Sequence, residues 1–262
     1  IGARIGAAAE RPNPARAGAV AVIPVYGTIV QRADMFTEMS GGTSTERLSG
    51  MFAEAMSAPS VGSIVLRIDS PGGGVYGVAE LADQILKARG RKQIVAVADS
   101  MAASAAYWIA SAADEIVVTP GGEVGSIGVF AAHEDISRFV DAEGVTVSLI
   151  SAGKYKVEGN PFEPLSEEAR TAMQNRVNDY YSLFVRAVAK GRGVSVDDVR
   201  GGFGEGRVVG AQQAVKLGMA DRVDTYDATV ARLARGGTRP SGQRADSEDI
   251  DLRRRRMRLL SH

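Results

Sequence analysis

Residues 99–108 read DSMAASAAYW, and they follow the apolar run IVAVA at residues 94–98. The apolar run predicts a buried strand, and the small residues after it predict a helix packed tightly against a sheet. Ser104 then stands at a turn from strand to helix, where the first backbone N–H groups of a helix have no partner within it. Such groups can stabilise the oxyanion that forms when a serine hydroxyl attacks a carbonyl. A tightly packed Ala/Ser helix without any chemistry explains the stretch equally well.

A second unit of the same kind lies upstream. The run SIVLRI at residues 63–68 predicts a strand that is broken by Pro71, and the glycines at 72–74 follow. Residues 78–86 then carry apolar side chains at the spacing of a helix. Glycines let a backbone approach a ligand and present its N–H groups. In a parallel sheet both turns lie at the carboxyl ends of the strands, where open α/β sheets bind ligands.

The glycines also fit a dinucleotide-binding motif. Gly72, Gly74 and Gly77 spell G-x-G-x-x-G after a strand, and Asp99 ends the next strand, where a ribose-binding acid is expected. However, residues 69–71 separate the strand from the first glycine, whereas this motif turns tightly off its strand. A further strand is predicted upstream, so this is not the N-terminal unit. The sequence therefore favours another use of these glycines.

Four segments together resemble the signal peptide peptidase A family of serine peptidases, peptidase family S49, and its phage-encoded relatives. In chain order they are DSPGGG at 69–74, AASAAYWIA at 102–110, GSIGV at 125–129 and GKYK at 153–156. The likeness runs from about Ile23 to Val223. It implies an α/β protein with the ClpP/crotonase-like fold, in which helices flank a parallel sheet, and it implies a homo-oligomer.

The resemblance also implies roles for particular residues. Ser104 is the expected nucleophile and Lys156 the expected general base of a Ser–Lys dyad. The amide of Gly72 or Gly73, together with that of Ala105, is expected to form the oxyanion hole. Many relatives have glycines straight after the serine, where this chain has Ala105 and Ala106.

The residue inventory agrees with such a dyad. The chain has no Cys, which excludes a thiol nucleophile, and of its two His only His133 lies away from the C-terminus. A Ser-His-Asp triad would rest on His133 alone. A lysine accepts a proton near neutral pH only if its pKa falls from about 10.4 through burial or a neighbouring cation. Lys154 and Lys156 both follow the strand-like run at 146–150, so Lys154 is a rival base or a helper. The resemblance, not the spacing, selects Lys156.

Two helices are predicted outside these motifs. Thr43 and Glu46 fit a capping box that begins a helix with Leu48 on its apolar face. A long helix is predicted from about Ser166 to Lys190 and is ended by Gly191. Its apolar stripe indicates core packing or a subunit contact.

The chain divides into three parts. Residues 1–17 are expected to be a flexible arm, and residues 18–235 the peptidase domain. Residues 236–262 contain RRRR at 253–256 and are expected to be a disordered Arg-rich tail, or a docking segment for an acidic or assembling partner.

Composition excludes several classes of protein. Lys+Arg and Asp+Glu are both 31, so the net charge of zero gives no reason to expect a nucleic acid partner. No apolar run is long enough to cross a membrane, and no signal peptide is visible. The chain begins with Ile, so an anchor upstream remains open. No cofactor and no metal are expected.

These observations predict a serine endopeptidase that cuts extended polypeptide. The absent anchor and the Arg-rich tail favour a phage head-maturation peptidase, acting on capsid or scaffold protein in the host cytoplasm or the assembling head. Three alternatives stay open. They are a cellular signal peptide peptidase A-like enzyme, a crotonase-like acyl-CoA enzyme and a non-catalytic assembly protein.

Overall fold

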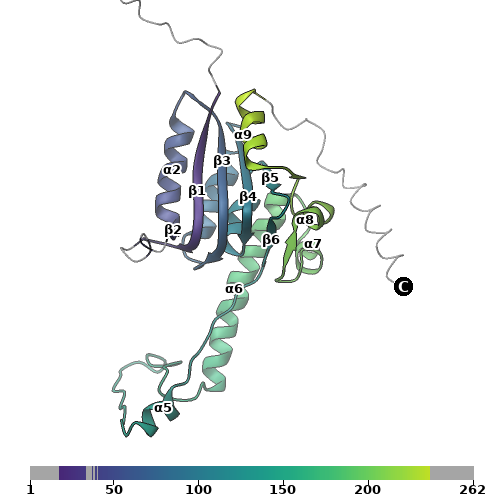
Figure 1. Cartoon of the computed structure of the whole chain (residues 1–262). Coiled ribbons are helices and arrows are strands. Elements are labelled where there is room, and N and C mark those ends of the chain that lie inside the picture. Colours follow the sequence, from purple (N-terminus) through teal and green to yellow (C-terminus); the bar gives the residue numbers. More distant parts are fainter. Residues whose placement is uncertain (1–17, 34–36, 38, 40, 237–262) are drawn as a thin grey trace, which may run out of the picture.

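The structure is a computed structural model that describes residues 18–33, 37, 39 and 41–236. The predicted arm at 1–17 and the Arg-rich stretch of the predicted tail lie outside the described residues. The described part of the chain folds as one sheet with helices on both faces (Figure 1).

The sheet has eight strands in the described residues, ordered β2-β1-β3-β4-β5-β8, with β6 beside β4 and β7 beside β6. Their bounds are β1 Ala19–Val30, β2 Thr43–Ser44, β3 Val61–Gly73, β4 Gln93–Ala103, β5 Glu115–Val118, β6 Glu123–Gly125, β7 Val208–Gly210 and β8 Arg222–Val223. The predicted parallel sheet is confirmed for most of these pairs, but β6 and β7 run antiparallel. The sheet is therefore mixed.

The helices lie between and after these strands. Their bounds are α2 Thr45–Ser57, α3 Val78–Ala88, α4 Ala105–Ser111, α5 Ser137–Ala142, α6 Glu167–Arg192, α7 Val196–Gly202, α8 Ala211–Leu217 and α9 Tyr226–Ala234. Helices α2, α3, α4 and the C-terminal half of α6 share the larger apolar core with one face of the sheet. On the other face, α9 covers a smaller cluster, made of Val65, Val95, Val97, Val117 and Leu233. Both faces of the central strands are thus buried, which explains their continuous apolar runs.

Prolines mark irregular places in the sheet. The two-residue β2 pairs only with the end of β1, so Pro24 lies on a stretch of β1 that has β3 alone beside it. This agrees with the edge position that proline predicts. The sequence predicted that the strand β3 breaks at Pro71. This prediction is wrong, because β3 continues to Gly73. Pro71 falls in a shift of the β1–β3 register, where its missing N–H costs no ladder hydrogen bond.

The start of α2 differs from the predicted capping box. Ser44, not Thr43, is the N-cap, and its hydroxyl accepts a hydrogen bond from the N–H of Arg47. Thr43 is occupied elsewhere, because its Oγ1 accepts from the N–H of Tyr26 at 3.0 Å and donates to the carbonyl of Tyr26 at 2.7 Å. Thr43 therefore fastens the chain before α2 to β1.

The long helix α6 projects beyond the body of the molecule (Figure 1). It begins after its N-cap Ser166, as predicted, but passes through Gly191 and ends at the C-cap Gly193. Gly191 is required inside the helix, since a Cβ there would collide with the backbone of Ser111. Only the C-terminal half of the apolar stripe is packed on the core, through Phe184 and Val188.

Residues 129–165, here named the projecting segment, lie beside and beyond the N-terminal half of α6 (Figure 1). The run at 146–150, which the sequence analysis treated as strand-like, forms no strand. A strand needs a neighbour for its backbone groups, and this run lies away from the sheet. The segment exposes large apolar side chains, namely Phe130, Phe139, Val145, Val147, Leu149, Ile150, Tyr155 and Phe162. No helix in the described part of the chain is long and apolar enough to span a bilayer.

A buried carboxylate fastens the last elements to the sheet. Glu115 of β5 is fully buried and accepts hydrogen bonds from Arg232 of α9 at 2.9 and 3.0 Å. It also forms an ion pair with Arg222 of β8, with 2.7 Å between Nε and Oε1. One acid thus holds three elements together.

Replacement of this acid should destabilise the fold. Glu115→Gln leaves two arginines facing a neutral side chain, and we expect the free energy of unfolding to fall by about 3 kcal/mol. Chemical denaturation measures the change. The control is Asp83→Asn, which breaks the exposed pair of Asp83 with Lys87 and should change stability far less. Equal effects of the two variants would contradict the structural role of Glu115.

Candidate functional site

Ser104 lies between the end of β4 and the start of α4. Its backbone has φ 53° and ψ −123°, a conformation that non-glycine residues rarely adopt. The N–H of Ser104 donates to the carbonyl of Gly125 at 2.8 Å, and its carbonyl accepts from the N–H of Trp108 at 3.0 Å. The serine is partly exposed, while Ala103 and Ala105 on either side are buried. The sequence prediction of a serine at a strand-to-helix turn is therefore confirmed.

The helix behind Ser104 is held rigidly. All residues of α4 are buried, and Trp108 stacks on Phe184 of α6 with 4.7 Å between ring centroids and 7° between ring planes. At the far end of α4, the guanidinium of Arg89 donates to the carbonyls of Ser111 and Gly191, both at 2.9 Å. These contacts hold the middle and the C-terminal end of α4, and the bond from Ser104 to Gly125 holds the residue before its start.

The glycine turn at the end of β3 lies directly against this serine. A Cβ on Gly72 would come within 2.7 Å of the Cβ of Ser104 and 2.9 Å of the backbone N of Ala105. Gly72 has φ +97°, so glycine is needed for both its conformation and its space. A Cβ on Gly73 would collide with the backbone of Ile29. The structure thus brings Ser104, Gly72, Gly73 and Ala105 together.

A buried serine that the sequence analysis gave no role supports this turn. Ser70 is fully buried, and its hydroxyl donates to the carbonyl of Gly27 at 2.6 Å. The same oxygen accepts from the N–H of Gly72 at 3.1 Å. The N–H of Gly74 donates to the carbonyl of Ile29 at 2.8 Å. The N–H groups of Gly72 and Gly74 are therefore already engaged on the β1 side of the turn.

The segment at 125–128 lies on the opposite side of Ser104 from the glycine turn. Gly125 ends β6, which pairs with the last residues of β4, and its carbonyl accepts from Ser104 as described. Ser126 follows with φ 52°, and its N–H donates to the carbonyl of Arg207 at 2.8 Å. Residues 126–128 form no helix or strand, and the GSIGV segment adjoins the candidate site through the bond from Ser104 to Gly125.

Lys156 is not brought to Ser104 within the chain. Lys156 is exposed on the projecting segment. Lys154 on the same segment donates a hydrogen bond to Glu168 in the first turn of α6. Phe184 stacks on Trp108, whose backbone N–H donates to the carbonyl of Ser104. The stretch of α6 from Glu168 to Phe184 is about 24 Å long. The projecting segment thus stands far from the sheet (Figure 1).

Lys154 has hydrogen-bond partners for its ammonium group. The Nζ of Lys154 donates to the hydroxyl of Tyr155 at 2.6 Å and to Glu168 at 3.0 Å. These hydrogen bonds, first that of Tyr155 and then that of Glu168, raise the pKa of Lys154. A raised pKa keeps this lysine protonated at neutral pH, so Lys154 is unsuited to accept a proton.

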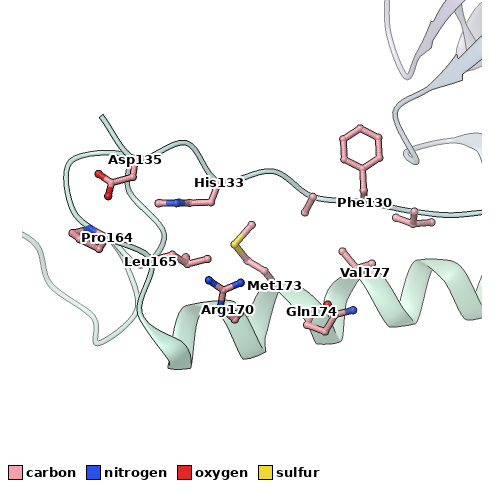
Figure 2. Close-up of a pocket in the computed structure, with 11 residues that line it drawn as sticks. Phe130, His133, Asp135, Pro164, Leu165, Arg170, Met173, Gln174 and Val177 are labelled. Carbon is pink, nitrogen blue, oxygen red and sulfur yellow. The ribbon is translucent and has the colours of Figure 1, made fainter. Parts of the chain in front are cut away.

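His133 also lies on the projecting segment, where a ring nitrogen is 3.0 Å from the carbonyl of Asn160. It lines a groove of about 640 Å³ between this segment and the N-terminal half of α6. Figure 2 shows Met173 pointing from α6 toward the segment near His133, while Phe130 points away from the helix. His133 is therefore not placed beside Ser104 within the chain.

Asp99, the acid of the alternative dinucleotide motif, forms an ion pair with Arg67. Its carboxylate accepts from the Nε of Arg67 at 2.7 Å, on the face of the sheet that α9 partly covers. Gly77 begins α3, and a Cβ there would collide with the side chain of Thr45. Both residues thus have structural uses that require no nucleotide.

The strain at Ser104 predicts an unusual effect of glycine. Ser104→Gly should be more stable than Ser104→Ala by about 1 kcal/mol, because relief of about 1–3 kcal/mol of strain exceeds the entropic cost of about 0.5–1 kcal/mol. Thermal unfolding measures this difference. Ala106→Gly in α4 is the control and should lower the melting temperature. If the alanine variant at 104 is the more stable one, the backbone there is not strained.

The chain is similar in sequence to proteins of two phages. Head-tail preconnector protein GP5 of Enterobacteria phage P21 is 36% identical over 228 residues, which is 84% of this chain and 45% of that protein. Capsid assembly protease C of Escherichia phage lambda is 35% identical over 228 residues, which is 83% of this chain and 52% of that protein. The chain therefore spans about half the length of these two relatives.

A solved structure of a ClpP1 mutant from Listeria monocytogenes superposes with a TM-score of 0.50 at 15% identity, covering 82% of this chain and 95% of that one. This likeness concerns the fold alone, and it confirms the predicted ClpP-like architecture. The model of the family described as Peptidase family S49 matches residues 78–238. The matched stretch includes Ser104 and most of the chain, and the chain belongs to peptidase family S49.

Proposed function

We propose that this chain is a serine endopeptidase that cuts extended polypeptide, with Ser104 as its nucleophile. One observation carries the proposal. A strained serine stands at the end of a central strand, and the backbone of Gly72 lies against both its Cβ and the amide of Ala105. Strain of this kind persists only where the surroundings impose it, and it clusters at active sites. Membership of peptidase family S49 supports the same chemistry.

The oxyanion hole is assigned to the amides of Gly73 and Ala105. The N–H of Gly72 is engaged by Ser70, and the N–H of Gly74 is engaged by β1. Since the N–H groups of Gly72 and Gly74 both point to the β1 side, and N–H groups alternate in side along a strand, we assign the N–H of Gly73 to the side of β4, which carries Ser104. Two amides so placed can hold the negative charge of a tetrahedral intermediate.

The general base is Lys156, supplied by a second copy of the chain. Lys156 lies too far from Ser104 to act within its own chain, and Lys154 is held protonated by Tyr155 and Glu168. The projecting segment that carries Lys156 also exposes Phe130, Phe139 and Ile150, as an oligomer interface would require. A homo-oligomer in which this segment lies over the neighbour's Ser104 explains both features.

The reaction follows from these placements. Lys156 takes the proton of the Ser104 hydroxyl as its oxygen attacks the peptide carbonyl, and the Gly73 and Ala105 amides hold the oxyanion. Lys156 returns the proton to the leaving amine, which leaves an acyl group on Ser104. A water molecule, deprotonated by Lys156, then attacks the carbonyl of the acyl group, and the intermediate expels the Ser104 oxygen, which takes the proton back from Lys156 as the acid leaves.

The proposed setting is the maturation of a phage head, with capsid or scaffold protein as substrate, in the host cytoplasm or the assembling head. The two phage relatives, at 36% and 35% identity, support this setting. A cellular enzyme like signal peptide peptidase A is the second candidate, favoured by the putative signal peptide peptidase SppA of Enterococcus faecium at 33% identity over 164 residues. Labelling by a fluorophosphonate, with the adduct mapped to Ser104, separates either peptidase from an acyl-CoA enzyme or an inert assembly protein.

The divided dyad predicts complementation between inactive variants. Ser104→Ala and Lys156→Ala should each lose cleavage of fluorescein-labelled casein, because members of one catalytic unit fail together. When the two inactive variants are unfolded together and refolded as a mixture, part of the activity should return. Lys154→Ala is the control and should stay active alone. A mixture that stays inactive would place both residues in one chain, and an active Lys156→Ala would exclude the dyad.

The packing of the glycine turn gives a second prediction. Gly72→Ala places a methyl group against Ser104 and the Ala105 amide, and we expect turnover to fall about 10²-fold or more. Gly74→Ala is a matched control, since a Cβ there meets only the carbonyl of Ile29 at 3.8 Å. Casein cleavage by folded samples, checked by circular dichroism, measures both. Equal activities of the two variants would show that the turn does not adjoin the reacting atoms.

A further inference from the structure

We propose that Ser70 is a positioning residue, whose hydroxyl orients the glycine turn so that the Gly73 amide faces the reacting carbonyl. The inference rests on the proposed function of Ser104. It goes further by assigning a part in transition-state stabilisation to a side chain that does not touch the substrate.

The contacts of Ser70 leave its hydroxyl one orientation. Its single hydrogen is committed to the carbonyl of Gly27 over 2.6 Å, so toward Gly72 the oxygen can act only as an acceptor. Donation to Gly27 polarises the hydroxyl and strengthens its bond from the N–H of Gly72. Since Ser70 is fully buried, water cannot replace either partner without rearrangement.

The acceptor of Ser70 is itself fixed in place. Gly27 has φ +60° and lies in the register shift between β1 and β3, with no room for a Cβ because the carbonyl of Gly41 would be 2.6 Å away. The preceding residue, Tyr26, is held at both its N–H and its carbonyl by Thr43. A continuous chain of contacts thus runs from Thr43 through β1 and Ser70 to Gly72.

The bond to Gly72 decides where the next amide points. With its N–H tied to Ser70 and its Cα packed against Ser104, Gly72 has little freedom to rotate. Its φ of +97°, together with the rotation about its Cα–C bond that the packing limits, orients the peptide that carries the N–H of Gly73. Loss of the hydroxyl leaves the N–H of Gly72 and the carbonyl of Gly27 without this partner. The turn then changes conformation, and the amide of Gly73 no longer points at the oxyanion.

Kinetics of Ser70→Ala test the proposal. Initial rates on fluorescein-labelled casein should show kcat lowered about tenfold or more with KM nearly unchanged, because the lost interaction acts in the transition state. Affinity for a leucine peptide boronic acid should fall by a similar factor, while affinity for the matching peptide amide should not. Ser63→Ala is the matched control, being a buried serine near the other end of β3. Ser70→Thr, which keeps the hydroxyl, should recover part of kcat.

The outcomes separate the possibilities. If Ser70→Ala behaves as Ser63→Ala does, or if boronic acid and amide affinities fall together, the positioning role is wrong. If Ser70→Ala does not fold, Thr43→Val tests the same chain of contacts. A lower kcat at unchanged KM supports the positioning role, and an unchanged kcat overturns it. Failure of the proposed function is seen separately, as casein cleavage that survives Ser104→Ala.

Discussion

The close approach of the Gly72 backbone to Ser104 is the constraint on which the rest of the site depends. It requires glycine at position 72, a β3 strand that continues past Pro71, and a strained serine at the end of β4. The packing of α4 serves the same end, because Trp108, Phe184 and the guanidinium of Arg89 keep the helix from moving away. Burial around the turn thus maintains a conformation that the local sequence does not favour.

Much of this arrangement could be predicted from local patterns. The strand before Ser104, the glycine turn and the helix α3 follow from apolar spacing and breaker residues, which act over a few positions. The roles of Ser70 and Thr43 could not be predicted, because their partners Gly27 and Tyr26 lie far away along the chain. Fully buried serine in a strand is the only hint, and burial itself is a tertiary property.

At residues 146–150 a local pattern predicted a strand that the structure does not contain. These residues have the composition of a strand, yet they lie apart from the sheet. Strand propensity measures fit to a neighbouring surface, and no strand of the described residues lies beside this run. Lys156 lies far from Ser104 for a related reason, since the run and Lys156 belong to a segment that contacts α6 and lies away from the sheet (Figure 1). Under the proposed assembly, the lysine selected by resemblance is placed by a second copy of the chain, which no local pattern in the sequence predicts.

The 26-residue helix α6 gives that division a biological consequence. It holds the segment that carries Lys156 away from Ser104 of the same chain, so under the proposed assembly a dispersed chain is inactive because its nucleophile has no base beside it. Activity then follows mass action and rises only where copies accumulate. Newly made protein would be harmless to its surroundings at low concentration and would switch on inside a crowded particle, with timing set by local concentration.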